Sequence, residues 1–160
     1  MLYVVATPIG NLKDISLRAL EVLKNVDLIL CEDTRVTKKL LSYYNIKTPV
    51  LSYHSYSKLR RINYILHLLE RKKRIAMVCD AGTPGISDPG EKLISLIKSK
   101  IPNTKIVPIP GPCALIAALC ISGIPSDKFL FLGFLPKTVS YTHLRAHETR
   151  HDLVCRLLLE

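Results

Sequence analysis

The sequence predicts an α/β fold, with a mainly parallel sheet and flanking helices. Short apolar runs alternate along the chain with segments whose apolar residues have helical spacing. Several of the apolar runs end in proline or acidic residues, which are typical of loops and helix starts. Because strands that alternate with helices form right-handed βαβ units, this order predicts a parallel sheet.

Each apolar run corresponds to one predicted strand, and helices are predicted between the strands. The strands are residues 2–6, 27–31, 49–53, 75–79, 105–109 and 129–134. Asp14 is predicted to cap the first helix, whose apolar stripe runs over residues 15–23. A basic helix is predicted at about residues 58–72, and an apolar helix at residues 113–122 is stopped by Gly123.

The chain is densest in turn-forming residues between Asp80 and Gly90. This segment contains three glycines and two prolines and follows directly on the apolar run 75–79. Glycine permits a positive φ and close approach to a ligand, whereas proline stiffens a turn. Asp88 and Pro89 are typical of an N-cap and a first-turn residue of a helix. Such a loop at the carboxyl end of a strand predicts a ligand site, with an ordinary βα connection as the alternative.

The other predicted strands also end in loops that carry unusual residues. Parallel strands bring such loops to one edge of the sheet, where open α/β proteins bind ligands. The loops are residues 7–12, 32–35, 54–57, 80–90 and 110–114. The first has a single glycine and matches neither the dinucleotide fingerprint nor the phosphate loop, so those two nucleotide-binding sites are not favoured.

Candidate catalytic residues lie in two of these loops. Glu32, Asp33 and Arg35 place two acids and a base at one strand end. The alternative for this motif is a salt-bridged turn that caps the next helix. His54 is a candidate general base, with an ordinary surface residue as the alternative.

The charge of the chain predicts an anionic partner. Its formal net charge is +10 and its pI is near 9.5, which fits RNA, DNA or an anionic membrane surface. The basic side chains favour a phosphate backbone, with solvated helix faces as the alternative; they include Lys38, Lys39, Arg60 and Arg61. The uncharged stretch 106–125 is long enough to span a bilayer, but its four prolines and two glycines argue against a spanning helix. The five cysteines, an odd number set mostly in apolar runs, indicate free thiols in a reducing compartment.

Four motifs occur together in this chain in the order that one known family has them. They are VVATPIGNL at residues 4–12, EDTR at 32–35, DAGTPGISDPG at 80–90 and PGP at 110–112. On these motifs, residues 1 to about 137 resemble the bacterial 16S ribosomal RNA (cytidine) 2′-O-methyltransferase I family. That family belongs to the tetrapyrrole-methylase-like (class III) methyltransferase superfamily. The resemblance implies the N-terminal domain of that fold, with the methyl donor in a cleft beside a second domain.

The resemblance implies S-adenosyl-L-methionine as the donor and a cytidine 2′-hydroxyl of 16S rRNA in the small ribosomal subunit as the acceptor. It also implies a cytoplasmic enzyme, a homodimer when full length. The matching positions place the donor against Asp80, Ala81, Gly82, Thr83, Ile86, Ser87, Pro110, Gly111, Pro112 and Ala114. A ribose hydroxyl needs a group that draws off its proton, and the candidates are Glu32, Asp33 and His54. Arg35 is a candidate for orienting an RNA phosphate.

The end of the chain departs from the family pattern. Cys113 stands where the family commonly has serine, and the residues after His54 lack the acidic and amide side chains expected there, which weakens a catalytic role for His54. After Lys137 the family continues with a basic linker and a second domain, whereas this chain resembles translated adapter-like sequence. We therefore expect a truncated chain, with the methyltransferase domain at 1–125, a final strand and linker start at 126–137, and a non-native tail at 138–160.

The expected tail contains a metal-like pattern. His143, His147, His151 and Cys155 repeat every four residues, so a helix would align them. Because they lie in a tail that we expect to be non-native, we predict no metal site.

Two alternatives to an rRNA methyltransferase stay open, namely a tetrapyrrole-precursor methyltransferase and a non-catalytic RNA-binding fragment. The basic surface and the motif at residues 32–35 argue against the first of them.

Overall fold

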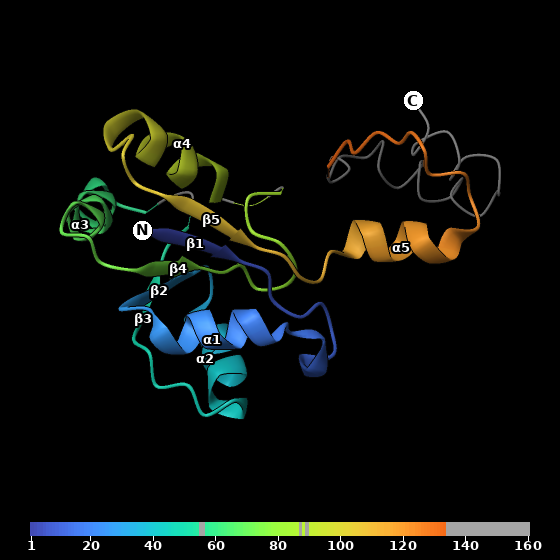
Figure 1. Ribbon diagram of the computed structural model, residues 1–160, viewed down its shortest axis with the longest axis horizontal. Coiled ribbons are helices and arrows are strands. Elements are labelled where there is room, and N and C mark those ends of the chain that lie inside the picture. Colours follow the sequence, from blue (N-terminus) through green and yellow to red (C-terminus); the bar gives the residue numbers. More distant parts are fainter. Residues whose placement is uncertain (55–56, 87, 89, 134–160) are drawn as a thin grey trace, which may run out of the picture. The chain divides into compact units, whose positions relative to one another are not determined.

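The computed structural model describes residues 1–54, 57–86, 88 and 90–133. Their strands form a parallel sheet, as predicted, with five strands in the order β3-β2-β4-β1-β5 (Figure 1). The strands are β1 (Leu2–Val5), β2 (Leu28–Cys31), β3 (Val50–Ser52), β4 (Ile75–Met77) and β5 (Ile106–Ile109). The helices are η1 (Leu12–Asp14), α1 (Leu17–Asn25), α2 (Thr34–Tyr43), α3 (Leu59–Glu70), α4 (Gly90–Lys100) and α5 (Ala114–Ser122).

The strand that leads into the glycine-rich segment is the middle strand of the sheet. Ile75 of β4 pairs with Leu2 of β1 on one side and with Leu28 of β2 on the other. All three residues of β4 are buried, which explains their continuous apolar sequence. The loop that follows β4 therefore leaves the sheet between the loops of two other strands.

Helices cover both faces of the sheet. Apolar residues of α1 and α2, such as Leu23 and Leu40, pack with Val5 under one face. Residues of α3 and α4, such as Ile65 and Leu93, pack on the other face, where Leu2, Val4 and Leu30 also point. Figure 1 shows the two helix pairs on opposite sides of the strands.

The strand order explains this arrangement and places the ligand edge. From β1 to β3 the chain moves across the sheet in one direction, and from β3 to β5 it moves back. Right-handed crossovers then place α1 and α2 on one face and α3 and α4 on the other. The loops after β2 and β4 consequently leave toward opposite faces, and a crevice between neighbouring strands forms at such a point.

Two local predictions were wrong. Ser16, not Asp14, caps α1, because its hydroxyl accepts a hydrogen bond from the Ala19 backbone N–H at 3.1 Å. Asp14 instead ends the short helix η1. The strand predicted at 129–134 is not present in residues 129–133, which pair with no strand among the described residues; Phe134 lies outside them. A strand forms by hydrogen bonding to a neighbour, and apolar composition does not supply that neighbour.

Residues 1–114 form one compact unit, and the described residues 115–133 belong to a second. The apolar helix α5 ends before Gly123, whose φ of +68° is the left-handed conformation typical of a helix end. Throughout the described residues, no helix is both long enough and apolar enough to cross a membrane.

We predict that Ser16→Ala lowers the free energy of unfolding by about 1 kcal/mol, because one N–H at the start of α1 loses its acceptor. Asp14→Ala is the matched control and should have a much smaller effect. Urea denaturation followed by circular dichroism measures both variants. An equal or larger loss in Asp14→Ala would contradict this assignment of the cap.

Candidate active site

The loop after β4 is fastened to the loop after β1 by a two-residue bridge. The Thr7 N–H donates to the Gly82 carbonyl at 2.8 Å, and the Gly82 N–H donates to the Thr7 carbonyl at 3.1 Å. The buried Thr7 hydroxyl also donates to the Cys79 carbonyl at 3.0 Å. These three hydrogen bonds therefore fix the backbone at the start of the loop after β4.

Asp88 fixes the second half of this loop. Its carboxylate accepts hydrogen bonds from the backbone N–H groups of Gly85 and Gly90, both at 2.8 Å. The three glycines serve different needs: Gly82 and Gly85 have left-handed φ angles of +85° and +91°. At Gly90 a Cβ would lie 2.8 Å from an Asp88 carboxylate oxygen and 3.1 Å from the Gly85 nitrogen, so there the constraint is space.

The loop after β5 contacts both the loop after β4 and the end of β1. The Thr83 hydroxyl donates to the Pro112 carbonyl at 3.1 Å. Gly111 lies so close to β1 that a Cβ there would be 3.0 Å from the Ala6 Cβ. The hydrogen bonds thus connect the loops after β1, β4 and β5. The predicted donor residues in these loops are Asp80, Ala81, Gly82, Thr83, Ile86, Pro110, Gly111, Pro112 and Ala114, and Ser87 lies outside the described residues.

The motif after β2 forms a compact ion pair. Asp33 caps α2 by accepting from the Arg35 backbone N–H at 2.8 Å, and its carboxylate also binds the Arg35 guanidinium at 2.7 Å. Hydrogen bonding to Arg35 lowers the pKa of Asp33 to about 2. The salt-bridged turn considered above is therefore present. Asp33 is ionised and weakly basic, while 87% of the Arg35 side chain stays exposed.

Asp80 connects the loop after β2 to the loop after β4. Its carboxylate accepts a hydrogen bond from the Asp33 backbone N–H at 3.1 Å. Glu32, Pro84 and Asp88 help to line a small cavity at the ends of β2 and β4. The Glu32 carboxylate forms no hydrogen bond or ion pair with the described residues, which leaves it available to a ligand.

The middle of the carboxyl edge, where β2 and β4 end, is acidic although the chain is strongly basic. Glu32, Asp33, Asp80 and Asp88 all lie in the loops after β2 and β4, and Arg35 is the cation among them. The net charge of the whole chain is nevertheless +10. A local excess of carboxylates favours a positively charged ligand over an anion.

The cysteines near this edge are structural. Cys79 is buried, and its thiol lies 3.3 Å from the carbonyl oxygens of Ala81 and Gly82. Burial raises the pKa of Cys79 to about 12, so the group stays a protonated thiol at neutral pH. Cys31 is likewise buried, and burial raises its pKa. Neither group has the properties of a nucleophile.

The predicted RNA-binding cations lie on two faces rather than one. Lys38 and Lys39 are exposed on α2, whereas Arg60 and Arg61 lie on α3, which covers the opposite face of the sheet. Arg61 donates to the Ser52 carbonyl of β3 at 3.0 Å, so it also has a structural role. These two helices flank the edge strand β3.

His54 lies within the described residues, whereas the His/Cys stripe of the C-terminal segment does not. The His54 N–H donates to the Ser57 hydroxyl at 2.9 Å, and the Ser57 N–H donates back to the His54 carbonyl at 2.8 Å, so both bonds use the backbone of His54. In the part of the chain that is described, no three His, Cys, Asp or Glu side chains gather as metal ligands. The stripe at residues 143–155 lies outside that part.

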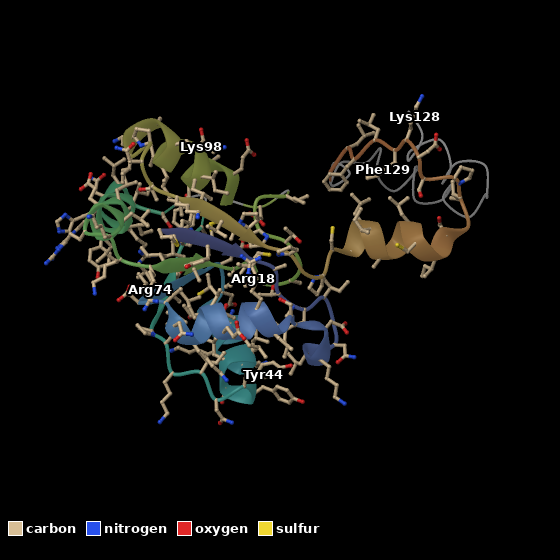
Figure 2. All side chains as sticks on the ribbon, viewed as in Figure 1. Arg18, Tyr44, Arg74, Lys98, Lys128 and Phe129 are labelled. Carbon is tan, nitrogen blue, oxygen red and sulfur yellow. The ribbon has the colours of Figure 1, made fainter. Side chains whose placement is uncertain are left out.

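Sequence patterns did not reveal two residues that shape the edge. Thr7 was placed in a loop without a role, although a threonine directly after an apolar strand suggests a buried hydroxyl. Tyr44 follows α2, and its hydroxyl donates to the Leu12 carbonyl at 2.7 Å, which ties α2 to the loop after β1 (Figure 2). No local pattern identifies that contact, because 32 positions separate the two residues.

An open parallel sheet with connected loops at its carboxyl edge defines a ligand-binding α/β domain. The family profile of Tetrapyrrole (Corrin/Porphyrin) Methylases matches residues 1–154, and the chain belongs to this family.

Within this family, the chain is similar to curated proteins that share one name. A protein of Synechocystis is 52% identical over 135 residues, which are 84% of this chain and 48% of the relative. A Thermotoga maritima protein is 51% identical over 136 residues, which are 85% of this chain and 60% of that protein. Both are named ribosomal RNA small subunit methyltransferase I. The chain spans about half the length of the first curated relatives it matches.

Solved structures share the fold at low identity. A cobalt precorrin-4 methyltransferase has a TM-score of 0.60 and 20% identity, and the match covers 91% of this chain and 64% of that enzyme. The uroporphyrin-III-C-methyltransferase of Thermus thermophilus has a TM-score of 0.57 and 18% identity, and the match covers 78% of this chain and 53% of that enzyme. These likenesses establish the fold and leave the acceptor open.

We predict that the Asp33 carboxyl titrates with a pKa of about 2 and that Arg35→Ala raises this pKa, because the first cause of the shift is the Arg35 side chain. The folded-state pKa is depressed, so the stabilisation by this pair is present above pH ~4 and is lost as pH falls through the folded pKa. Carbon NMR of the side-chain carboxyl measures it, with Lys38→Ala as control. An unchanged pKa in Arg35→Ala would rule out the ion pair as the cause.

We also predict that Gly90→Ala lowers the free energy of unfolding by about 1–3 kcal/mol, the usual cost of overpacking. The added methyl group must displace the Asp88 carboxylate, which two backbone N–H groups hold in place. Glu91→Ala, one residue further along α4 and exposed, is the control. Urea denaturation that gave the two variants equal stability would disprove the packing argument.

Proposed function

We propose that this chain is the donor-binding domain of an S-adenosyl-L-methionine-dependent enzyme that methylates a cytidine 2′-hydroxyl in 16S rRNA. The observation that carries the proposal is the identity of about one half with several proteins named ribosomal RNA small subunit methyltransferase I. The four motifs at the carboxyl edge, which first suggested this family, lie in the loops after β1, β2, β4 and β5. The proposal includes the small ribosomal subunit as partner and a cytoplasmic location; dimerisation of a longer chain stays a prediction.

The chemistry of the edge fits this donor. S-adenosyl-L-methionine supplies a methyl group bound to a positively charged sulfur. The carboxylates of Glu32 and Asp80 favour such a cation, and no phosphate-binding fingerprint is needed for it. A Cβ on Gly82 would reach 3.5 Å from Ile9 and 3.8 Å from the Pro112 carbonyl. The missing side chain at Gly82 therefore keeps space open between three loops.

The three predicted catalytic residues divide into two roles. Glu32 is the better proton acceptor for the ribose hydroxyl, because its carboxylate is unpaired among the described residues whereas Asp33 is engaged by Arg35. Asp33 positions the exposed Arg35 guanidinium, whose remaining N–H groups can bind an RNA phosphate. Holding the acceptor oxygen in line with the methyl group is expected to supply much of the acceleration.

A tetrapyrrole-precursor acceptor is the second candidate, and the family match favours it. The solved tetrapyrrole methyltransferases share 18–20% identity with this chain, far below the rRNA methyltransferase relatives. Exposed cations on α2 and α3 also fit a phosphate backbone better than a porphyrinoid. The rRNA acceptor is therefore preferred.

We predict that the chain binds S-adenosyl-L-methionine in titration calorimetry and that Gly82→Ala weakens this binding about tenfold, the effect of about 1.4 kcal/mol. The matched control is Gly123→Ala, which has a similar left-handed φ of +68° and open space around it. Both variants carry the strain of a left-handed alanine. Only the variant in the loop after β4 should lose donor affinity.

Acceptor assays separate the alternatives. Radiolabelled methyl transfer to small subunits, followed by nucleoside analysis, should yield 2′-O-methylcytidine. Transfer to a uroporphyrin-type acceptor instead would support the second candidate. RNA binding without any donor binding would indicate a non-catalytic RNA-binding fragment.

A further inference from the structure

A pocket of about 500 Å³ lies beside the edge strand β3, at the start of α3. Its lining includes Leu51 of β3, His54 in the following loop and four residues at the start of α3, namely Lys58, Arg60, Arg61 and Tyr64. Ligand pockets in proteins have about this volume. His54 lies two residues after the end of β3, so the pocket is at the same carboxyl edge as the candidate active site. It lies at the end of the sheet, because β3 is an edge strand.

The positive charge of this pocket favours an anionic ligand. Among the described residues that line it, three are cations and none is acidic. Lys58, Arg60 and Arg61 form no ion pair with any acid among the described residues. Neighbouring like charges repel one another, and an anionic ligand relieves that repulsion. Arg61 already donates to the Ser52 carbonyl at 3.0 Å, whereas Lys58 and Arg60 are exposed and form no side-chain hydrogen bond with the described residues.

An aromatic ring lies beside these charges. Tyr64 follows Arg60 by four positions on α3, so the two side chains share one face of the helix. The Tyr64 side chain is 52% exposed, and Leu51 adds an apolar wall. Cations for a phosphate next to an exposed ring for stacking are the combination by which proteins bind single-stranded nucleic acid.

We propose that this pocket binds one nucleotide of the single-stranded RNA segment that carries the acceptor ribose, with its phosphate at Lys58 and Arg60 and its base on Tyr64. The inference rests on the proposed function and adds to it the strandedness of the substrate and a second anchoring point. The bases of a duplex are already stacked on one another, so a duplex cannot use Tyr64.

Fluorescence anisotropy of the full 160-residue chain with a labelled octaribonucleotide tests the proposal. Arg60→Ala should weaken binding about tenfold and reduce the slope of log affinity against log salt by about 0.7, the value for one single-strand phosphate. Tyr64→Ala should weaken RNA binding about tenfold without changing that slope. Tyr64→Phe keeps the aromatic ring and should restore the RNA affinity. Lys98→Ala removes an exposed charge from α4, outside the pocket, and is the control (Figure 2).

The outcomes are distinguishable from those of the proposed function, because donor binding is measured on the same variants by calorimetry. Normal donor binding together with unchanged RNA affinity in Arg60→Ala and Tyr64→Ala would overturn the pocket and leave the proposed function intact. Loss of RNA affinity in both variants of a chain that binds no donor would support the pocket and refute the proposed function. Equal binding of a duplex or of polyglutamate would overturn the assignment to single-stranded RNA.

Discussion

The pairing of Thr7 with Gly82 is the constraint on which the ligand edge depends. It joins the first and the fourth strand's loops through two backbone hydrogen bonds, and the buried Thr7 hydroxyl adds a third contact at Cys79. The pairing requires Gly82 to adopt a φ of +85°, which is costly for any residue with a side chain. Because Gly82 is held in this way, the next residue, Thr83, can reach the Pro112 carbonyl and bring in the loop after β5.

The distribution of charge follows from the same architecture. Loops after β2 and β4 bring four carboxylates to the middle of the carboxyl edge, while the basic helices α2 and α3 flank the sheet at β3. Pairing with Arg35 lowers the pKa of Asp33 to about 2, so Asp33 stays negative at any physiological pH. The edge can therefore favour a cationic small molecule at its centre and a polyanion at its side. The proposed function, in which one domain holds a sulfonium donor and RNA together, requires this separation.

The sequence predicted the parallel sheet and the edge that carries the loops, because both follow from periodicity and from local turn chemistry. Contacts between loops could not be predicted. The Asp80–Asp33 hydrogen bond joins residues 47 positions apart, and no local pattern contains it. The helix cap was misassigned because Asp14 and Ser16 are both good caps, and the short helix η1 determines which of them precedes α1. Residues 129–133 have strand composition, but composition cannot supply a neighbouring strand.

The adjacent Arg60 and Arg61 illustrate why basic residues cannot be assigned a function from charge alone. Arg61 satisfies the Ser52 carbonyl of the edge strand, and a charged side chain at this position also discourages pairing with a strand of another molecule. That role needs no RNA. Arg60 is exposed and has no partner among the described residues, yet it lines a pocket that also contains Lys58 and Tyr64. Structural need therefore accounts for Arg61, whereas for Arg60 the explanation is the RNA ligand that we propose.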